Sequence, residues 1–174
     1  MKKDFITPVL VLTLICLIIA GALALVNNVT YPIIRDAAAE RAYTARKDII
    51  PEANEFILIE SEELPRAVAE AYITDNHTGY IFVINVYGYG GYIKIICGID
   101  TDGRIIKSKV VAHTETQGMG TIVFDRAVEY EGMDKNLEGS IDGIAGSTIT
   151  FNAYRRAVLY AFEAFEIVRR DNLE

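Results

Sequence analysis

The longest apolar stretch of the chain lies close to its N-terminus. Positions 5–26 are interrupted only by two threonines, one proline and one glycine, and no charged residue occurs between Asp4 and Arg35. At about 1.5 Å per residue, a helix of this length spans roughly 33 Å, which is enough to cross a hydrocarbon core about 30 Å thick. The pattern therefore predicts a transmembrane helix over residues 5–27, preceded by a cytoplasmic tail at residues 1–4.

The flanks of this stretch predict its direction. Lys2 and Lys3 precede it together with the amino terminus. The positive-inside rule therefore keeps the N-terminus in the cytoplasm and places the rest of the chain on the extracytoplasmic side of the inner cell membrane. A cleaved signal peptide is the alternative, because residues 22–24 (Ala-Leu-Ala) match an A-x-A cleavage site. We favour the uncleaved anchor, since small and apolar residues continue past that site.

Beyond the anchor the pattern changes twice. Residues 37–42 are rich in alanine and predict a helical stalk over residues 28–51 that ends at Pro51. Short runs rich in Ile, Val and Tyr follow and predict strands, and turns that contain glycine or asparagine separate the last four of them. The five runs are residues 56–60, 68–74, 80–87, 92–99 and 104–112.

The last predicted element is an amphipathic helix over residues 152–170. Its apolar residues recur at three- and four-residue spacing, and charged residues occupy the other face. The Asp102-Gly103 turn joins the last two strands as an antiparallel hairpin. The sequence therefore predicts an α+β fold, in which a single N-terminal transmembrane helix precedes a mostly antiparallel sheet flanked by helices. Residues 52–174 form the outer domain.

Composition narrows the possible functions of this domain. The chain has 17 basic and 24 acidic residues; residues 1–34 hold two of the former and one of the latter, which leaves 15 against 23, a net charge of −8 for the rest. Nucleic-acid binding needs clustered Lys and Arg, so this balance argues against it. The two cysteines, Cys16 and Cys97, have no CxxC spacing and give no support to a metal or iron–sulfur site.

Three glycine-containing segments are candidates for ligand binding. Residues 88–91 lack the third glycine of a dinucleotide-binding loop and lead into a strand, so a tight turn is expected there. Residues 113–121 combine flexible glycines with hydroxyls and a carboxylate, and form either a ligand-binding loop or a surface turn before a helix near residues 122–130. Residues 142–150 precede the final helix, whose N-terminus offers N–H groups to a phosphate, although plain N-capping satisfies the same composition.

Residues 142–148 resemble the flavinylation motif of the FMN-binding domain family, D-x-x-[ST]-G-A-T. In that family a separate flavin transferase esterifies the last threonine to the phosphate of FMN. The resemblance therefore implies that Thr148 carries covalent FMN and that Asp142 and Gly146 are recognition elements. Two small residues depart from the pattern, and one of them, Ser147, offers an alternative hydroxyl for the attachment.

The preceding loop carries the same resemblance. Residues 115–120 are similar to the family's E-T-P-G-L-G, with Gln117 in place of Pro and Met119 in place of Leu. The resemblance implies that this loop borders the flavin. Its expected cofactor-binding residues are Glu115, which orients the loop, Thr116 and Met119, which contact FMN, and the backbone of Gly118 and Gly120.

One membrane anchor followed by one such domain, at this length, resembles the G-subunit family of Rnf-type ion-translocating ferredoxin:NAD oxidoreductases. The resemblance implies an electron-carrying subunit with no catalytic acid or base of its own, whose partners are the other membrane subunits of the complex and the flavin transferase. Two alternatives stay open. One is the C subunit of the Na⁺-translocating NADH:quinone oxidoreductase, which shares the design but is typically longer, and the other is a non-redox, membrane-anchored binding module.

Overall fold

The computed structural model describes residues 2–137 and 142–171 of the 174-residue chain. Side chains of the first helix are described from Ile6 onward. Three parts of the predicted segments lie outside the described residues: Met1 of the tail, and residues 138–141 and 172–174 of the outer domain. The chain divides into two compact units, Met1–Tyr43 and Thr44–Glu174.

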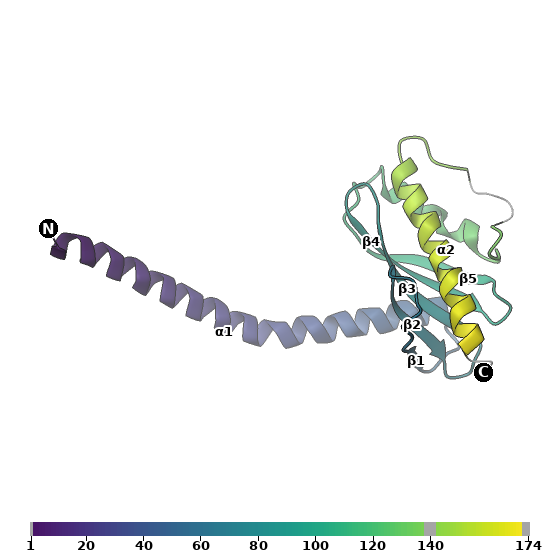
Figure 1. Ribbon diagram of the computed structural model, residues 1–174, viewed down its shortest axis with the longest axis horizontal. Helices are drawn as coiled ribbons and strands as arrows, with labels where there is room; N and C mark the ends of the chain where they lie inside the picture. The colour runs from purple at the N-terminus through teal and green to yellow at the C-terminus, as the bar shows by residue number, and fades with distance from the viewer. Residues whose placement is uncertain (1, 138–141, 172–174) are drawn as a thin grey trace. The chain divides into compact units, whose positions relative to one another are not determined.

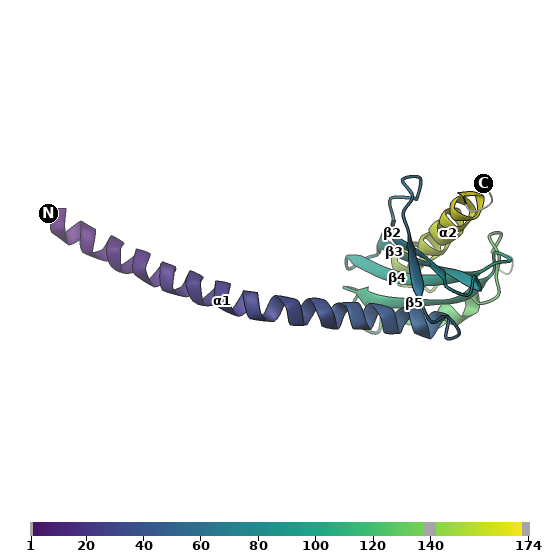
Figure 2. The same ribbon diagram turned by 90° about the horizontal axis from the view of Figure 1, so that it is seen from below.

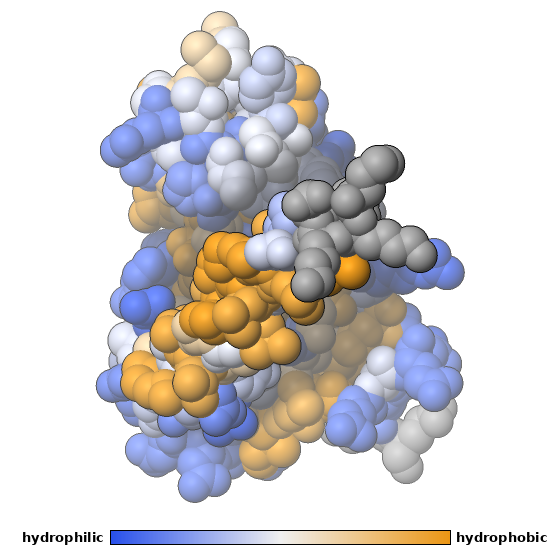
Figure 3. All heavy atoms as spheres, turned by 90° about the vertical axis from the view of Figure 1, so that its left-hand side faces the viewer, coloured by the Kyte–Doolittle hydropathy of each residue, from blue (hydrophilic) through white to orange (hydrophobic). Residues whose placement is uncertain are grey.

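Helix α1 runs without a break from Lys2 to Ile49 (Figure 1). Its segment Ile6–Ile49 is long and apolar enough to cross a membrane, and no other helix in the described part of the chain is. The large apolar side chains from Ile6 to Ile34 are exposed, and they gather as orange spheres in the space-filling view (Figure 3). Exposed apolar surface of this extent fits association with a membrane.

The second unit is built on a five-stranded antiparallel sheet in which neighbours in sequence are neighbours in space (Figure 1). The predicted α+β class is confirmed, and each predicted strand end lies within one residue of the observed end. Short turns that contain glycine, asparagine or aspartate join the last four strands to one another, whereas the longer segment 60–67, which contains none of these residues, joins the first two. The strands are β1 (Phe56–Ile59), β2 (Val68–Thr74), β3 (Gly79–Tyr87), β4 (Tyr92–Asp100) and β5 (Ile105–His113).

Helix α2 (Thr148–Asp171) covers one face of the sheet. Successive side chains of a strand point to opposite faces, so Ile93, Ile95 and Cys97 of β4 share the core beneath α2. The helix meets them with a stripe of small, branched and aromatic residues. Its buried side chains include Ala153, Tyr154, Ala157, Val158, Ala161, Phe162 and Phe165.

The opposite face of the sheet is covered by the end of α1 that belongs to the second unit (Figure 2). Ile49 and Ile50 pack there against Ile81 and Ile96. Close to them, the guanidinium of Arg46 lies 4.4 Å from the centroid of the Tyr72 ring. Both faces of the central strands are therefore buried, which explains why these strands are almost continuously apolar.

The final helix begins earlier than predicted, at Thr148 instead of residue 152. Thr150 and Phe151 are buried, so tertiary packing holds the first turn helical although threonine is a weak helix former. The helix predicted near residues 122–130 is present as the 3₁₀-helix η1 (Thr121–Tyr130).

Candidate functional site

A cavity of about 360 Å³ opens beside the first turn of α2. Three segments that are far apart in sequence meet there: the β3–β4 turn, the loop after β5, and the start of α2 (Figure 1). The lining residues are Tyr89, Glu115, Thr116, Met119, Gly120, Gly146, Ser147, Thr148, Ile149 and Thr150.

The β3–β4 turn is closed on itself and also tied to the loop after β5. Gly88 N–H donates to the carbonyl oxygen of Gly91 at 2.9 Å, as predicted for a tight turn. The Thr114 hydroxyl donates to the Gly90 carbonyl at 3.0 Å, and Gly90 N–H donates to Oε1 of Glu115 at 2.9 Å. The turn therefore has a fixed place at the cavity wall.

Glu115 joins all three segments through one buried carboxylate. Its side chain accepts the Gly90 N–H on Oε1 and the Thr150 hydroxyl, at 2.8 Å, on Oε2. The residue is only 7% exposed, so both oxygens need these donors. Because Thr150 lies in the first turn of α2, this carboxylate links the hairpin directly to the helix start.

Glycines make this packing possible. A Cβ on Gly120 would lie 2.5 Å from Oε2 of Glu115, and one on Gly90 would lie 2.5 Å from the Thr114 carbonyl oxygen. A Cβ on Gly88 would also collide with Oε1 of Glu115. Any larger residue at these positions would push the carboxylate or the loop away from the cavity.

Two adjacent hydroxyls at the start of α2 have different environments. Ser147 accepts the first helical hydrogen bond, from Phe151 N–H at 2.9 Å, and is 5% exposed. Its own hydroxyl donates to the Met119 carbonyl at 2.5 Å, so it does not act as the expected N-cap. Thr148 is exposed and lines the cavity, and among the described residues its hydroxyl has no hydrogen-bond partner.

The electrostatics of the cavity come from backbone and not from cations. None of the lining side chains is Lys, Arg or His, and Glu115 is the one ionisable carboxylate among them. The N-terminal N–H groups of α2 have no partner within the helix, and no acidic residue occupies its first turn. The helix N-terminus therefore presents a partial positive charge at Thr148.

Arg126 of η1 holds the segment that leads into α2. Its guanidinium donates to the Asp142 carbonyl oxygen at 2.6 Å and pairs with Glu129. The hydrogen bonds from Arg126 lower the pKa of the Glu129 carboxyl below its usual value. Gly146, which follows in the turn before the helix, has a φ of +84° that favours glycine.

Most of the residues expected from the sequence meet at this cavity, but not all. Seven line it: Glu115, Thr116, Met119, Gly120, Gly146, Ser147 and Thr148. Gly118 and Asp142 do not line it. Gly118 has a φ of +79°, and its N–H donates to the Thr121 hydroxyl at 2.9 Å, so it shapes the loop.

Sequence reasoning did not assign Tyr89 or Ile149 to the site. Tyr89 lies in what looked like a plain connecting turn, and only the bond between Gly90 and Glu115 brings that turn to the cavity. His113 packs on Phe124 with ring centroids 5.0 Å apart. Among the described residues, no three metal-ligating side chains cluster.

This arrangement of loop, hairpin and helix start coincides with a known domain. Residues 88–163 match the FMN-binding domain family. The resemblance expected from the motifs is thereby confirmed. The matched region begins at the β3–β4 turn and runs into α2, so it contains every residue that lines the cavity.

Comparison of the whole chain extends this result. It is 29% identical over 193 residues to the G subunit of the ion-translocating oxidoreductase complex of Shewanella piezotolerans, covering 92% of this chain and 89% of the relative. The G subunit of the Na⁺-translocating ferredoxin:NAD⁺ oxidoreductase complex of Acetobacterium woodii is 25% identical over 185 residues, covering 90% and 89%. The proton-translocating counterpart of Clostridium ljungdahlii is 23% identical over 163 residues, covering 87% and 86%. Over most of its length the chain is therefore similar to the G subunits of these complexes.

Proposed function

We propose that this chain is the FMN-carrying subunit of an ion-translocating ferredoxin:NAD⁺ oxidoreductase complex and that the flavin is joined covalently to Thr148. The relatives support the electron-transfer role, because they are G subunits of such complexes and align with most of this chain. The FMN-binding domain supports the cofactor. The other subunits of the complex are then its partners.

The contrast between Thr148 and Ser147 is the observation that carries the covalent assignment. The Ser147 hydroxyl is buried and engaged with the Met119 carbonyl at 2.5 Å. The Thr148 hydroxyl is exposed at the cavity. A transferase can therefore move the FMN phosphoryl group from a flavin nucleotide donor to the Thr148 oxygen, with the donor's leaving group departing and the hydroxyl proton released, without breaking a hydrogen bond of the fold.

The surroundings of Thr148 fit a phosphoester. The first N–H groups of α2 are available to its oxygens, as at other anion sites on helix N-termini. Among the described residues other than its two chain neighbours, no atom lies within 4 Å of where a Cβ on Gly146 would stand, so these residues leave the approach to Thr148 open. No cation lines the cavity, and Glu115 adds a negative charge, so a covalent bond, and not ion pairing, retains the flavin.

The remaining residues of the site hold and orient the flavin. FMN supplies one- and two-electron redox chemistry when bound. Thr116 and Met119 contact it from the loop after β5, while Glu115 keeps that loop against the helix start. The Asp142 side chain and Gly146 serve as recognition elements for the flavin transferase, and Arg126 fixes the backbone there.

The apolar N-terminal helix tethers the flavin-binding domain to the membrane. A helix long and apolar enough to span a membrane precedes the domain, and the two N-terminal lysines support an extracytoplasmic location of the flavin. The tether prevents the carrier from diffusing away from the complex.

Retention of flavin after denaturation tests the covalent assignment. The chain is co-expressed with a flavin transferase, purified in detergent and run on a denaturing gel, and the flavin fluorescence of the band is measured. We expect a fluorescent band for the wild type and for Ser147→Ala, and none for Thr148→Val, which keeps the shape of threonine but lacks the hydroxyl. A fluorescent Thr148→Val band together with a dark Ser147→Ala band would move the attachment to Ser147.

A further inference from the structure

We propose that Tyr89, at the tip of the β3–β4 hairpin, forms one wall of the flavin pocket and lies against the isoalloxazine ring. This inference rests on the proposed function, because it takes the cavity beside Thr148 as the flavin site. It assigns a ligand-contacting role to a residue outside both glycine-containing motifs that indicated the site.

Exposed apolar surface surrounds the cavity. Tyr89 is 72% exposed, and Met119 and Ile149, which line the same cavity, are 56% and 54% exposed. Three large side chains with apolar surface facing one cavity mark a ligand site more than a solvated surface. A flat aromatic ring seated among them would bury all three.

Tyr89 is the one aromatic side chain among the described residues that line the cavity. Aromatic rings prefer offset-stacked or edge-to-face contact with other flat π-systems. The isoalloxazine ring is such a system, whereas Met119 and Ile149 offer only aliphatic and thioether contact. Tyr89 is therefore the residue of this cavity best suited to the face or edge of the flavin.

The tip of the β3–β4 hairpin is linked through Glu115 to the first turn of α2, which bears Thr148. Gly90, the neighbour of Tyr89, donates its N–H to Glu115, and the same carboxylate accepts the hydroxyl of Thr150 in the first turn of α2. The Thr114 hydroxyl holds the Gly90 carbonyl from the other side of the turn. One buried group thus fixes the distance between the Tyr89 wall and the helix that bears Thr148.

The hairpin offers its own control residue. Tyr87 is 60% exposed on the same hairpin, but it does not line this cavity. Its ring packs instead on Tyr92, with centroids 3.8 Å apart. Replacing Tyr87 therefore removes a tyrosine from the hairpin without removing a wall of the proposed flavin pocket.

Contact with a phenol has an optical consequence. A phenol in contact with the flavin ring would quench the flavin fluorescence by donating one electron reversibly to the excited state, which leaves both groups unchanged. The covalent flavin of the folded protein is then weakly fluorescent per molecule, and unfolding restores the emission by separating the two rings.

The test compares emission per covalently bound flavin in the full-length protein, in detergent and co-expressed with the transferase. Flavin loading is measured separately, from the absorbance of the denatured protein and the mass of the peptide that contains Thr148. We expect several-fold higher emission per flavin in Tyr89→Leu than in the wild type, and no increase in Tyr87→Leu. Tyr89→Phe, which keeps the ring but is a much poorer electron donor, is expected to show the same rise and serves if Tyr89→Leu does not fold.

Equal emission per flavin in the wild type, Tyr89→Leu and Tyr89→Phe, with full loading in each, would overturn the role of Tyr89 and leave the proposed function intact. An equal rise in Tyr87→Leu would also overturn it, because the effect would then belong to the hairpin as a whole. Absence of flavin from the wild-type peptide is a different result, and it contradicts the proposed function itself.

Discussion

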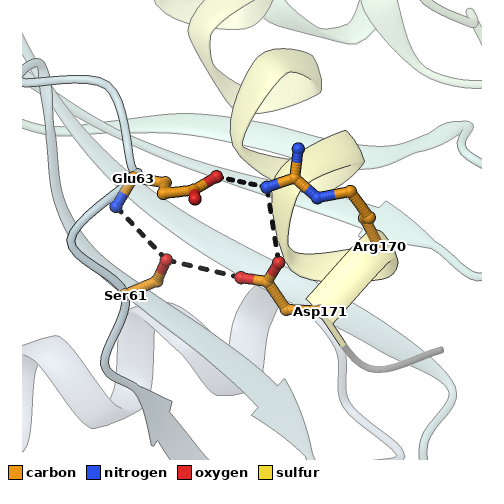
Figure 4. A network of polar contacts seen from close by, with 4 residues as sticks. All are labelled: Ser61, Glu63, Arg170 and Asp171. Atoms are coloured by element: carbon orange, nitrogen blue, oxygen red, sulfur yellow. Dashed lines mark hydrogen bonds and ion pairs between the residues drawn. The ribbon is translucent and has the colours of Figure 1, made fainter. Parts of the chain in front are cut away.

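The two ends of α2 differ in whether their polar groups are partnered within the domain. At its C-terminal end, Arg170 pairs with Glu63, and the Ser61 hydroxyl donates to Asp171 at 3.5 Å (Figure 4). At its N-terminal end, Thr148 faces a cavity, and the first N–H groups have no partner within the helix. The C-terminal end is held to the β1–β2 loop, whereas the N-terminal end is left available to a ligand.

The two ends of α2 also differ in their charged residues. Arg169 and Arg170 lie in the last turn, where cations stabilise the negative end of the helix dipole. The first turn has no acidic residue that would neutralise the positive end. The contrast teaches that α2 carries cations near its C-terminus and leaves the positive charge of its N-terminus available to an anion, which in the proposed function is the phosphate of FMN.

Replacing Glu115 has the largest expected effect on stability, because it releases the N-terminal end of α2 from both loops. Glu115→Ala leaves the Gly90 N–H and the Thr150 hydroxyl without their acceptor and creates a cavity, which we expect to lower the free energy of unfolding by about 2–4 kcal/mol. Glu115→Gln can accept from Gly90 and donate to Thr150, so its loss is smaller. Urea unfolding in detergent, followed by circular dichroism, measures both. Equal stabilities for the two variants would contradict the linking role of the carboxylate.

Replacing Gly146, in the turn before Thr148, has the next largest expected effect on stability. Gly146 has a φ of +84°, so Gly146→Ala is expected to destabilise the domain by about 1–2 kcal/mol through backbone strain alone. Gly143 is the matched control. A Cβ there would make only an ordinary contact, 3.8 Å from Phe151, so Gly143→Ala is expected to be near neutral. The comparison fails if the two alanine variants unfold at the same urea concentration.

The core between α2 and the sheet makes the stability of the domain depend on pH. Burial beneath α2 raises the pKa of the Cys97 thiol from 9.0 to about 12. The folded state therefore keeps its proton when the unfolded state loses it, and stability that is complete below pH 9 is lost as the pH rises toward 12. Between pH 9 and pH 10 we expect a loss of about 1 kcal/mol.

Cys97→Ala isolates this effect. In that variant the decline between pH 9 and pH 10 is expected to shrink, whatever the variant's stability at neutral pH. Tyr154, whose pKa is also raised by burial from an ordinary value of 10.0, adds a smaller decline over the same pH range, and this part remains in Cys97→Ala. Unfolding curves at several pH values measure the slope, and an unchanged slope in Cys97→Ala would rule out the thiol as its source.

The smallest effect is expected at the C-terminal end of α2. The side chains of Arg170 and Glu63 are 57% and 64% exposed, and ion pairs in solvent contribute little to stability. Arg170→Gln is therefore expected to change neither the unfolding midpoint measurably nor the amount of covalent flavin. A large loss of flavin in this variant would show that the two ends of α2 are not independent.

The strands were predictable because local signals agreed with the tertiary environment. From β2 onward, runs rich in Ile, Val and Tyr stand between clear turn residues, and the sheet contains every predicted run. The start of α2 was not predictable in the same way. Residues 147–150 are Ser-Thr-Ile-Thr, a weak helix-forming sequence, and only burial of Thr150 and Phe151 extends the helix to Thr148.

The candidate site was predictable where it lies within the motifs and hidden where it depends on contacts across the chain. Thr148 and Glu115 belong to short segments with a family pattern, and both line the cavity. Tyr89 reaches the same cavity through a hydrogen bond between residues 25 positions apart. The end of α1 looked like a stalk, yet Ile49 is buried against the sheet.

The most direct test of the central claim is the mass of the peptide that contains Ser147 and Thr148. The full-length chain, co-expressed with a flavin transferase, is digested with trypsin, and the peptide is fragmented to locate any modification. The proposed function predicts a mass increase equal to one FMN less one water, carried by Thr148 and not by Ser147. An unmodified peptide from fully processed protein, or a modification on Ser147, would contradict it.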